Sequence, residues 1–114
     1  MWQNVRGEKI RFAAIGTSAT SSILVGANEE RAIKVLAYAV VASGDCGFQF
    51  QSVGTSATDL TGIMYVVGNG GVASPYADPD EGPLFQTNSN EDLVLKINTP
   101  AYVGGHLSYY LESV

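Results

Sequence analysis

The sequence is poor in the residues from which most active sites are built. Its 114 residues include a single histidine, His106, and a single cysteine, Cys46. A catalytic triad needs a histidine base beside a nucleophile and a third group that orients the base, and no spacing in the chain nominates such partners for His106. One cysteine forms no disulfide within the chain and supports no zinc site. We therefore expect no enzyme activity and no cofactor.

Charged residues are also scarce, at 15% of the chain, with 6 basic residues against 11 acidic ones and a net charge of −5. Binding to nucleic acid through phosphate groups requires clustered basic residues. Only Arg6, Lys9 and Arg11 lie close together, as a basic arm or as an ordinary solvated strand face. We expect no nucleic-acid partner. The low charge implies apolar and small polar surface, part of it buried in an oligomer.

No segment has the composition of a membrane span. The charge-free run 60–77 is interrupted by glycines, an asparagine and a proline, so we expect no spanning helix and no membrane partner. The polar start MWQNVRGEK lacks a secretory apolar region. Together with the lone cysteine, it favours synthesis in a reducing cytoplasm.

Hydrophobic residues make up 46% of the chain, and alternation of apolar and polar residues recurs at intervals of about 10 residues. This pattern predicts an all-β fold, a single antiparallel β-sandwich of about eight strands. Residues 1–7 would form an N-terminal arm, and residues 8–114 the sandwich domain. We expect the strands at 9–15, 22–25, 32–43, 48–53, 60–67, 85–87, 93–98 and 103–114.

The most informative segment is 32–43, which is apolar at both odd and even positions after Lys34. Such a strand is covered on both faces, so we place it in the middle of a sheet. The next residues, Gly44 to Gly47, predict a tight turn that includes Cys46. Phe48 and Phe50 should then point inward, with the intervening glutamines outward.

One internal echo is visible. The string FAAIGTSAT at 12–20 recurs as FQSVGTSAT at 50–58. It indicates either two strands that leave the sandwich at similar corners or descent from a duplicated half.

The loop 75–83 contains three carboxylates, Asp78, Asp80 and Glu81. Hard cations such as calcium prefer several oxygen ligands at close range. The spacing is not that of an EF-hand loop, so a solvated loop and a calcium site both stay open.

Aromatic residues supply the candidate contact sites. Tyr76 and Tyr102 lie in expected loops near prolines and could contact a partner or stack against a sugar, and Tyr110 is a candidate for a subunit interface. Trp2 precedes every expected strand, where it could insert into a partner's pocket or fold back on its own domain. Arg6, in the same arm, joins these partner-binding candidates.

Three segments together resemble a known group of proteins. They are RAIKVLAYAVVAS at 31–43, LTGIM at 60–64 and VGGHLSYY at 103–110. Between about residues 8 and 112 the chain is similar to the small β-sandwich structural proteins of tailed bacteriophages, in which a basic residue introduces a buried V-L-A-Y strand and a G-G-x-L-x-Y strand closes the domain. The loop 75–83 and the Asp45-Cys46 turn are not part of that pattern.

The resemblance implies a jelly-roll domain that assembles on a virion, often as a homotrimer. It implies a capsid decoration or cement protein that binds the major capsid protein on the outer surface of the shell. A carbohydrate-binding or receptor-binding module of a phage head or tail fibre is the alternative. The resemblance carries no catalytic residue.

Overall fold

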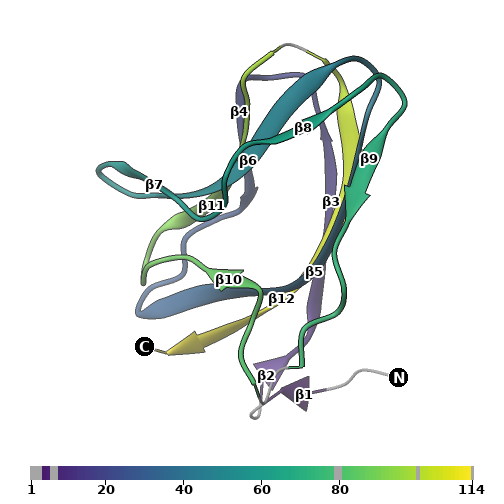
Figure 1. The fold of residues 1–114 in the computed structure, drawn as a ribbon. Coiled ribbons are helices and arrows are strands. Elements are labelled where there is room, and N and C mark those ends of the chain that lie inside the picture. Colours follow the sequence, from purple (N-terminus) through teal and green to yellow (C-terminus); the bar gives the residue numbers. More distant parts are fainter. Residues whose placement is uncertain (1–3, 6–7, 79–80, 100, 114) are drawn as a thin grey trace.

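The computed structural model describes residues 4–5, 8–78, 81–99 and 101–113. These residues form two five-stranded antiparallel sheets packed face to face, with a small separate hairpin below them (Figure 1). The expected antiparallel β-sandwich is therefore confirmed. The strands are β1 (Asn4–Val5), β2 (Glu8–Lys9), β3 (Arg11–Thr17), β4 (Ser21–Val25), β5 (Arg31–Ala42), β6 (Cys46–Val53), β7 (Ala57–Asp59), β8 (Met64–Val66), β9 (Gly71–Ala73), β10 (Phe85–Gln86), β11 (Asp92–Ile97) and β12 (Val103–Ser113).

The two sheets have the strand order of a jelly roll. The first sheet runs β10-β5-β12-β3 with β9 also paired to β5, and the second runs β4-β11-β6-β7 with β8 also paired to β6. We count β7 with β8 as one broken strand, and β9 with β10 as another, and leave out the separate hairpin of β1 and β2. Eight strands then remain, and we number them 1 to 8 along the chain, starting at β3. They are ordered 1-8-3-6 and 2-7-4-5, as in a jelly roll. The expected continuous strand at 60–67 is instead broken before β8.

β5 occupies the interior position that its apolar sequence predicts, because β12 pairs along one edge and β9 and β10 along the other. Ile33, Val35 and Val40 face the core and are fully buried. Burial on the opposite face is only partial. Leu36 is covered there, but Val41 is 53% exposed, so the outer face of the first sheet is open at one end.

The tight turn after β5 is present, but it is shorter than expected and forms no hairpin, because β5 and β6 belong to different sheets. Cys46 is already the first residue of β6 and is buried, so its assignment to the turn is wrong. Phe48 and Phe50 point into the core as predicted. The outward glutamines Gln49 and Gln51 are nevertheless buried, because β7, β8 and their connection lie beside them and bind both side-chain amides.

The core lies between the sheets and is apolar, with an aromatic cluster at its centre. The ring centroids of Tyr38 and Phe85 lie 5.0 Å and 5.1 Å, respectively, from the ring centroid of Phe50. Tilted pairs at this distance stabilise a core beyond simple burial. Leucine, isoleucine and valine from both sheets surround this cluster.

The echoed strings do not pack alike. Phe12, in the first copy, is 65% exposed on the outer face, whereas Phe50, in the second, is fully buried. The similarity of the two strings therefore does not extend to equivalent positions in the core.

Two expected segments are described only in part. The proposed arm 1–7 is described at β1, which pairs with β2 as a hairpin. In the acidic loop, the backbone N–H groups of Glu81 and Gly82 donate to the Asp78 carbonyl, and Asp80 lies outside the described residues. The described stretches contain no helix long and apolar enough to cross a bilayer.

Candidate interaction surface

The outer face of the first sheet carries a patch without lysine, arginine, aspartate or glutamate. Ala14 lies opposite His106, His106 opposite Ala39, and Ala39 opposite Ala73. Residues directly opposite one another in antiparallel strands share a face, so the neighbouring rows follow from the same pairings. We name this patch the neutral face. It comprises Phe12, Ala14, Gly16, Ala37, Ala39, Val41, Gly71, Ala73, Gly104, His106 and Ser108.

The neutral face is open to solvent at its largest side chains. Phe12 is 65% exposed and Val41 is 53% exposed. Most of the other members are alanine or glycine, which leave the sheet flat. Burying a charged side chain in an interface costs free energy, because the charge loses its water. The neutral face has no lysine, arginine, aspartate or glutamate, so its burial carries no such cost. It is thus suited to burial against another protein.

Tyr102 borders the neutral face at the end that contains Gly16 and Gly104. Its backbone carbonyl accepts a hydrogen bond of 2.8 Å from the N–H of Ser43. A Cβ atom on Gly16 would lie 2.9 Å from the Tyr102 hydroxyl, and one on Gly104 would lie 3.6 Å from its ring. The Tyr102 ring therefore occupies space that side chains at these two glycines would fill. Tyr102 is 56% exposed there.

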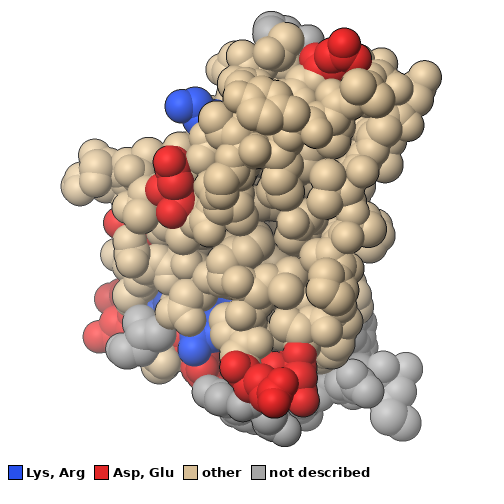
Figure 2. All heavy atoms as spheres, viewed as in Figure 1, with Lys and Arg blue, Asp and Glu red and all other residues tan. Residues whose placement is uncertain are grey.

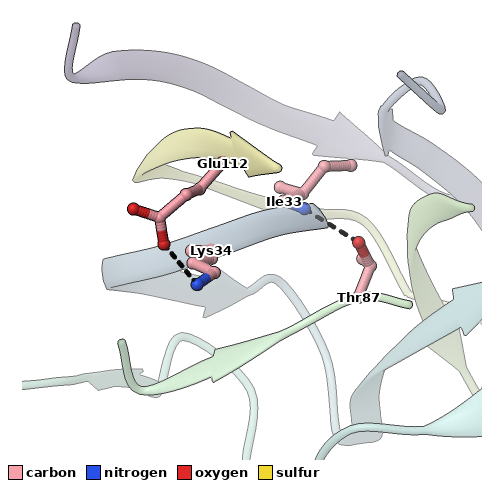
Figure 3. A network of polar contacts seen from close by, with 4 residues as sticks. All are labelled: Ile33, Lys34, Thr87 and Glu112. Carbon is pink, nitrogen blue, oxygen red and sulfur yellow. Dashed lines mark hydrogen bonds and ion pairs between the residues drawn. The ribbon is translucent and has the colours of Figure 1, made fainter. Parts of the chain in front are cut away.

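An ion pair lies on the same outer face beyond the neutral face, towards the start of β5. The Lys34 Nζ and Glu112 Oε1 atoms are 2.6 Å apart, and both side chains are largely buried (Figure 3). Beside the pair, Tyr110 and Leu36 pack with Ile10. The outer face of the first sheet thus has an open neutral end and a covered end.

Tyr110, the candidate for a subunit interface, is not exposed in the described fold. Its side chain is fully buried in the cluster with Ile10 and Leu36, against which Ala77 also packs. Alternation along β12 correctly turns Tyr110 away from the main core. However, alternation does not reveal that other segments cover this end of the sheet.

The other candidate residues do not gather at one site. Tyr76 is 55% exposed, but it lies next to Ala77, whose N–H donates to the Leu36 carbonyl. Tyr102 is tied to Ser43 at the other end of β5, roughly 20 Å away at the rise per residue of a strand. The two tyrosines therefore do not form a common platform. Trp2 and Arg6 lie outside the described residues.

The single cysteine is inaccessible and protonated at neutral pH. Burial raises the pKa of the Cys46 thiol, and the neighbouring Asp45 carboxylate raises it further. Nucleophilic cysteines have the opposite property, a lowered pKa with access to solvent. Burial also raises the pKa of Tyr38. In the described part of the chain, no three histidine, cysteine, aspartate or glutamate side chains gather as metal ligands would.

Several exposed apolar residues escaped the reasoning from sequence. They are Phe12 and Val41 on the neutral face, Ile23 in β4, and Ile63, Tyr65 and Val67 in and around β8. Alternation does place Phe12 and Ala14 on one face. It gives no sign that this face is the outer one, since a phenylalanine in a strand ordinarily indicates the core. The pairing of β3 with β12 decides the direction.

Comparison with known proteins adds no relative. No family model, no curated protein and no solved structure matches this chain.

Proposed function

We propose that this chain is a structural protein of a bacteriophage virion, a capsid decoration or cement protein that self-associates and binds the outer surface of the shell. The neutral face is the observation that carries the proposal. The jelly-roll strand order and the resemblance of segments 31–43, 60–64 and 103–110 to phage structural proteins support it. In this role the protein catalyses no reaction and binds no nucleic acid or membrane. It is made in the host cytoplasm and functions on the capsid.

The neutral face favours a second copy of the chain as its partner. Each copy has a net charge of −5, so two copies repel one another over most of their surfaces. On the neutral face, neither partner brings a carboxylate into the contact. On the side of the molecule that Figure 2 shows, charged side chains gather mainly at the lower end.

The size of the neutral face fits an assembly with several weak contacts. Three or four strands spaced about 4.8 Å apart, with three rows of outward residues, cover roughly 300–400 Å². A stable interface between two proteins usually buries about 800 Å² on each side. One such contact is therefore weak, and a pair of copies joined through their neutral faces and attached to a capsid at several points gains strength by avidity.

Light scattering coupled to size exclusion tests the role of the neutral face. Val41→Lys places a charge within it, and Ile23→Lys is the matched control, because Ile23 is 63% exposed on the second sheet. We expect oligomers for the wild type and Ile23→Lys, and monomers for Val41→Lys. Co-sedimentation with candidate capsids that lack the protein then tests the attachment. A monomeric wild type that ignores these capsids would overturn the proposal.

A further inference from the structure

A second exposed apolar region lies in the other sheet, along β8. Ile63, Tyr65 and Val67 alternate along the chain and are 42%, 74% and 71% exposed. Tyr65, the aromatic residue among them, is the most exposed of the three. The described strands pair β8 only with β6, where Tyr65 lies opposite Gly47.

Gly47 fixes the position of the Tyr65 ring. A Cβ atom on Gly47 would lie 2.8 Å from Cε1 of Tyr65, 2.8 Å from Cγ2 of Ile63 and 2.7 Å from Oδ1 of Asn98. These three side chains therefore converge over the bare backbone of β6. The Tyr65 ring thus lies against the backbone of Gly47, and most of the residue is exposed to solvent.

Two polar side chains beside the ring are held by the backbone and keep a second atom for a ligand. Asp45 Oδ1 accepts a hydrogen bond of 2.8 Å from the N–H of Gly68. Asn98 Oδ1 accepts one of 2.9 Å from the N–H of Gly47. Within the described part of the chain, no bond occupies Asp45 Oδ2 or the Asn98 amide nitrogen. Asp45 thus offers an acceptor in the lining of the site, and Asn98, bound to the backbone of Gly47, lies next to that lining and carries a donor.

A cavity of about 330 Å³ opens at this place, lined by Asp45, Cys46, Gly47, Tyr65, Val66, Val67 and Thr99. Small-molecule sites commonly have volumes of 300–1,000 Å³ and combine aromatic and apolar walls with a few fixed polar groups. Asp45 is the only charged residue in its lining. Together with the net charge of −5, that carboxylate disfavours anionic ligands.

We propose that the cavity beside Tyr65 binds a neutral saccharide. The apolar C–H face of a pyranose ring stacks on the Tyr65 ring, and its hydroxyl groups donate to Asp45 and accept from Asn98. Such a ligand needs an aromatic surface next to both an acceptor and a donor, and it carries no charge that Asp45 would repel. This site is separate from the neutral face and does not depend on self-association.

The test is a titration of the purified protein with neutral hexoses, N-acetylglucosamine, their disaccharides and, as an anionic comparison, sialic acid, with binding measured by ligand-observed NMR and calorimetry. We expect millimolar binding of at least one sugar by the wild type, weakened at least tenfold in Tyr65→Ala. Tyr76→Ala is the matched control, because that tyrosine is similarly accessible, lies outside the cavity and should leave affinity unchanged. Both side chains are exposed, so thermal unfolding should show that both variants fold.

Three outcomes would overturn the saccharide site. In the first, no sugar of the panel binds the wild type at millimolar concentrations. In the second, Tyr65→Ala binds as tightly as the wild type. In the third, sialic acid binds more tightly than the neutral sugars. None of these results bears on the oligomeric state measured by light scattering, so failure here leaves the assembly proposal to its own test.

Discussion

Gly105 in β12 and Ala39 in β5 approach so closely that a Cβ atom on Gly105 would lie 1.9 Å from the Ala39 carbonyl oxygen. Gly105 also has a φ of +150°, which residues with side chains rarely adopt. We expect Gly105→Ala to lower the free energy of unfolding by about 3 kcal/mol or more, because the strands must separate or distort. Urea denaturation measures this change.

Gly62→Ala is the control for that measurement. A Cβ atom on Gly62 meets nothing within 4 Å, so its effect should stay within about 0.5 kcal/mol. Similar stabilities for the two variants would show that β12 and β5 do not approach as described.

Thr87 holds the start of β5 through a buried hydrogen bond. Its Oγ1 accepts from the N–H of Ile33 at 2.9 Å, and Thr87 is 1% exposed (Figure 3). Thr87→Val keeps the shape of the side chain but leaves the Ile33 N–H without this acceptor. We expect a loss of about 1–3 kcal/mol in urea denaturation. Thr58→Val, at an exposed position in β7, should cost far less, and an equal cost would contradict the importance of the bond.

Tyr110 has a buried hydroxyl with no hydrogen-bond partner in the described part of the chain. Burial of an unpaired polar group costs free energy. We therefore expect Tyr110→Phe to leave the free energy of unfolding unchanged or to raise it by up to about 1 kcal/mol. A clear loss of stability in thermal or urea unfolding would indicate that the hydroxyl has a partner.

Cys46 should make the stability fall at alkaline pH. Burial raises the pKa of its thiol in the folded chain above the ordinary value of 9.0. The unfolded chain therefore releases this proton first, so the contribution to stability is complete well below pH 9 and is lost as the pH rises through the folded pKa. Urea unfolding between pH 7 and pH 10.5 measures the slope.

Cys46→Ala is the reference for that slope, because the two proteins share every ionisable group except this thiol. The wild type should lose stability more steeply than the variant above pH 9. Parallel curves would show that the thiol ionises equally in the folded and unfolded chains.

Much of the fold could be predicted from the sequence. Alternation predicts that Leu93 and Leu95 point inward and that Leu107 and Leu111 share one face of their strand, and the structure buries all four in the core. The doubly apolar run 32–43 identified the interior strand. The number of strands and the places where they break were harder to predict. β7, β8, β9 and β10 are only two or three residues long, which is too short to show the alternation of apolar and polar residues.

The candidate surfaces were less predictable. Exposure of Tyr76 and Tyr102 was expected, since prolines and turn residues surround them. Burial of Tyr110 and exposure of Phe12 were not expected, because both depend on which segment covers which end of the first sheet. The site at Tyr65 also depends on contacts between β6, β8 and Asn98, which are far apart in the sequence.

The sequence by itself determined the class of this protein. Period-two alternation, scattered turn residues and low charge are local properties, and they suffice for an antiparallel β-sandwich with an acidic net charge and few groups for catalysis. Only the tertiary structure decided which faces are open. A strand has two faces, and its own residues do not say whether a neighbouring segment or solvent lies against each one. Pairing between distant strands settles this, and it leaves the neutral face and the cavity beside Tyr65 at the surface.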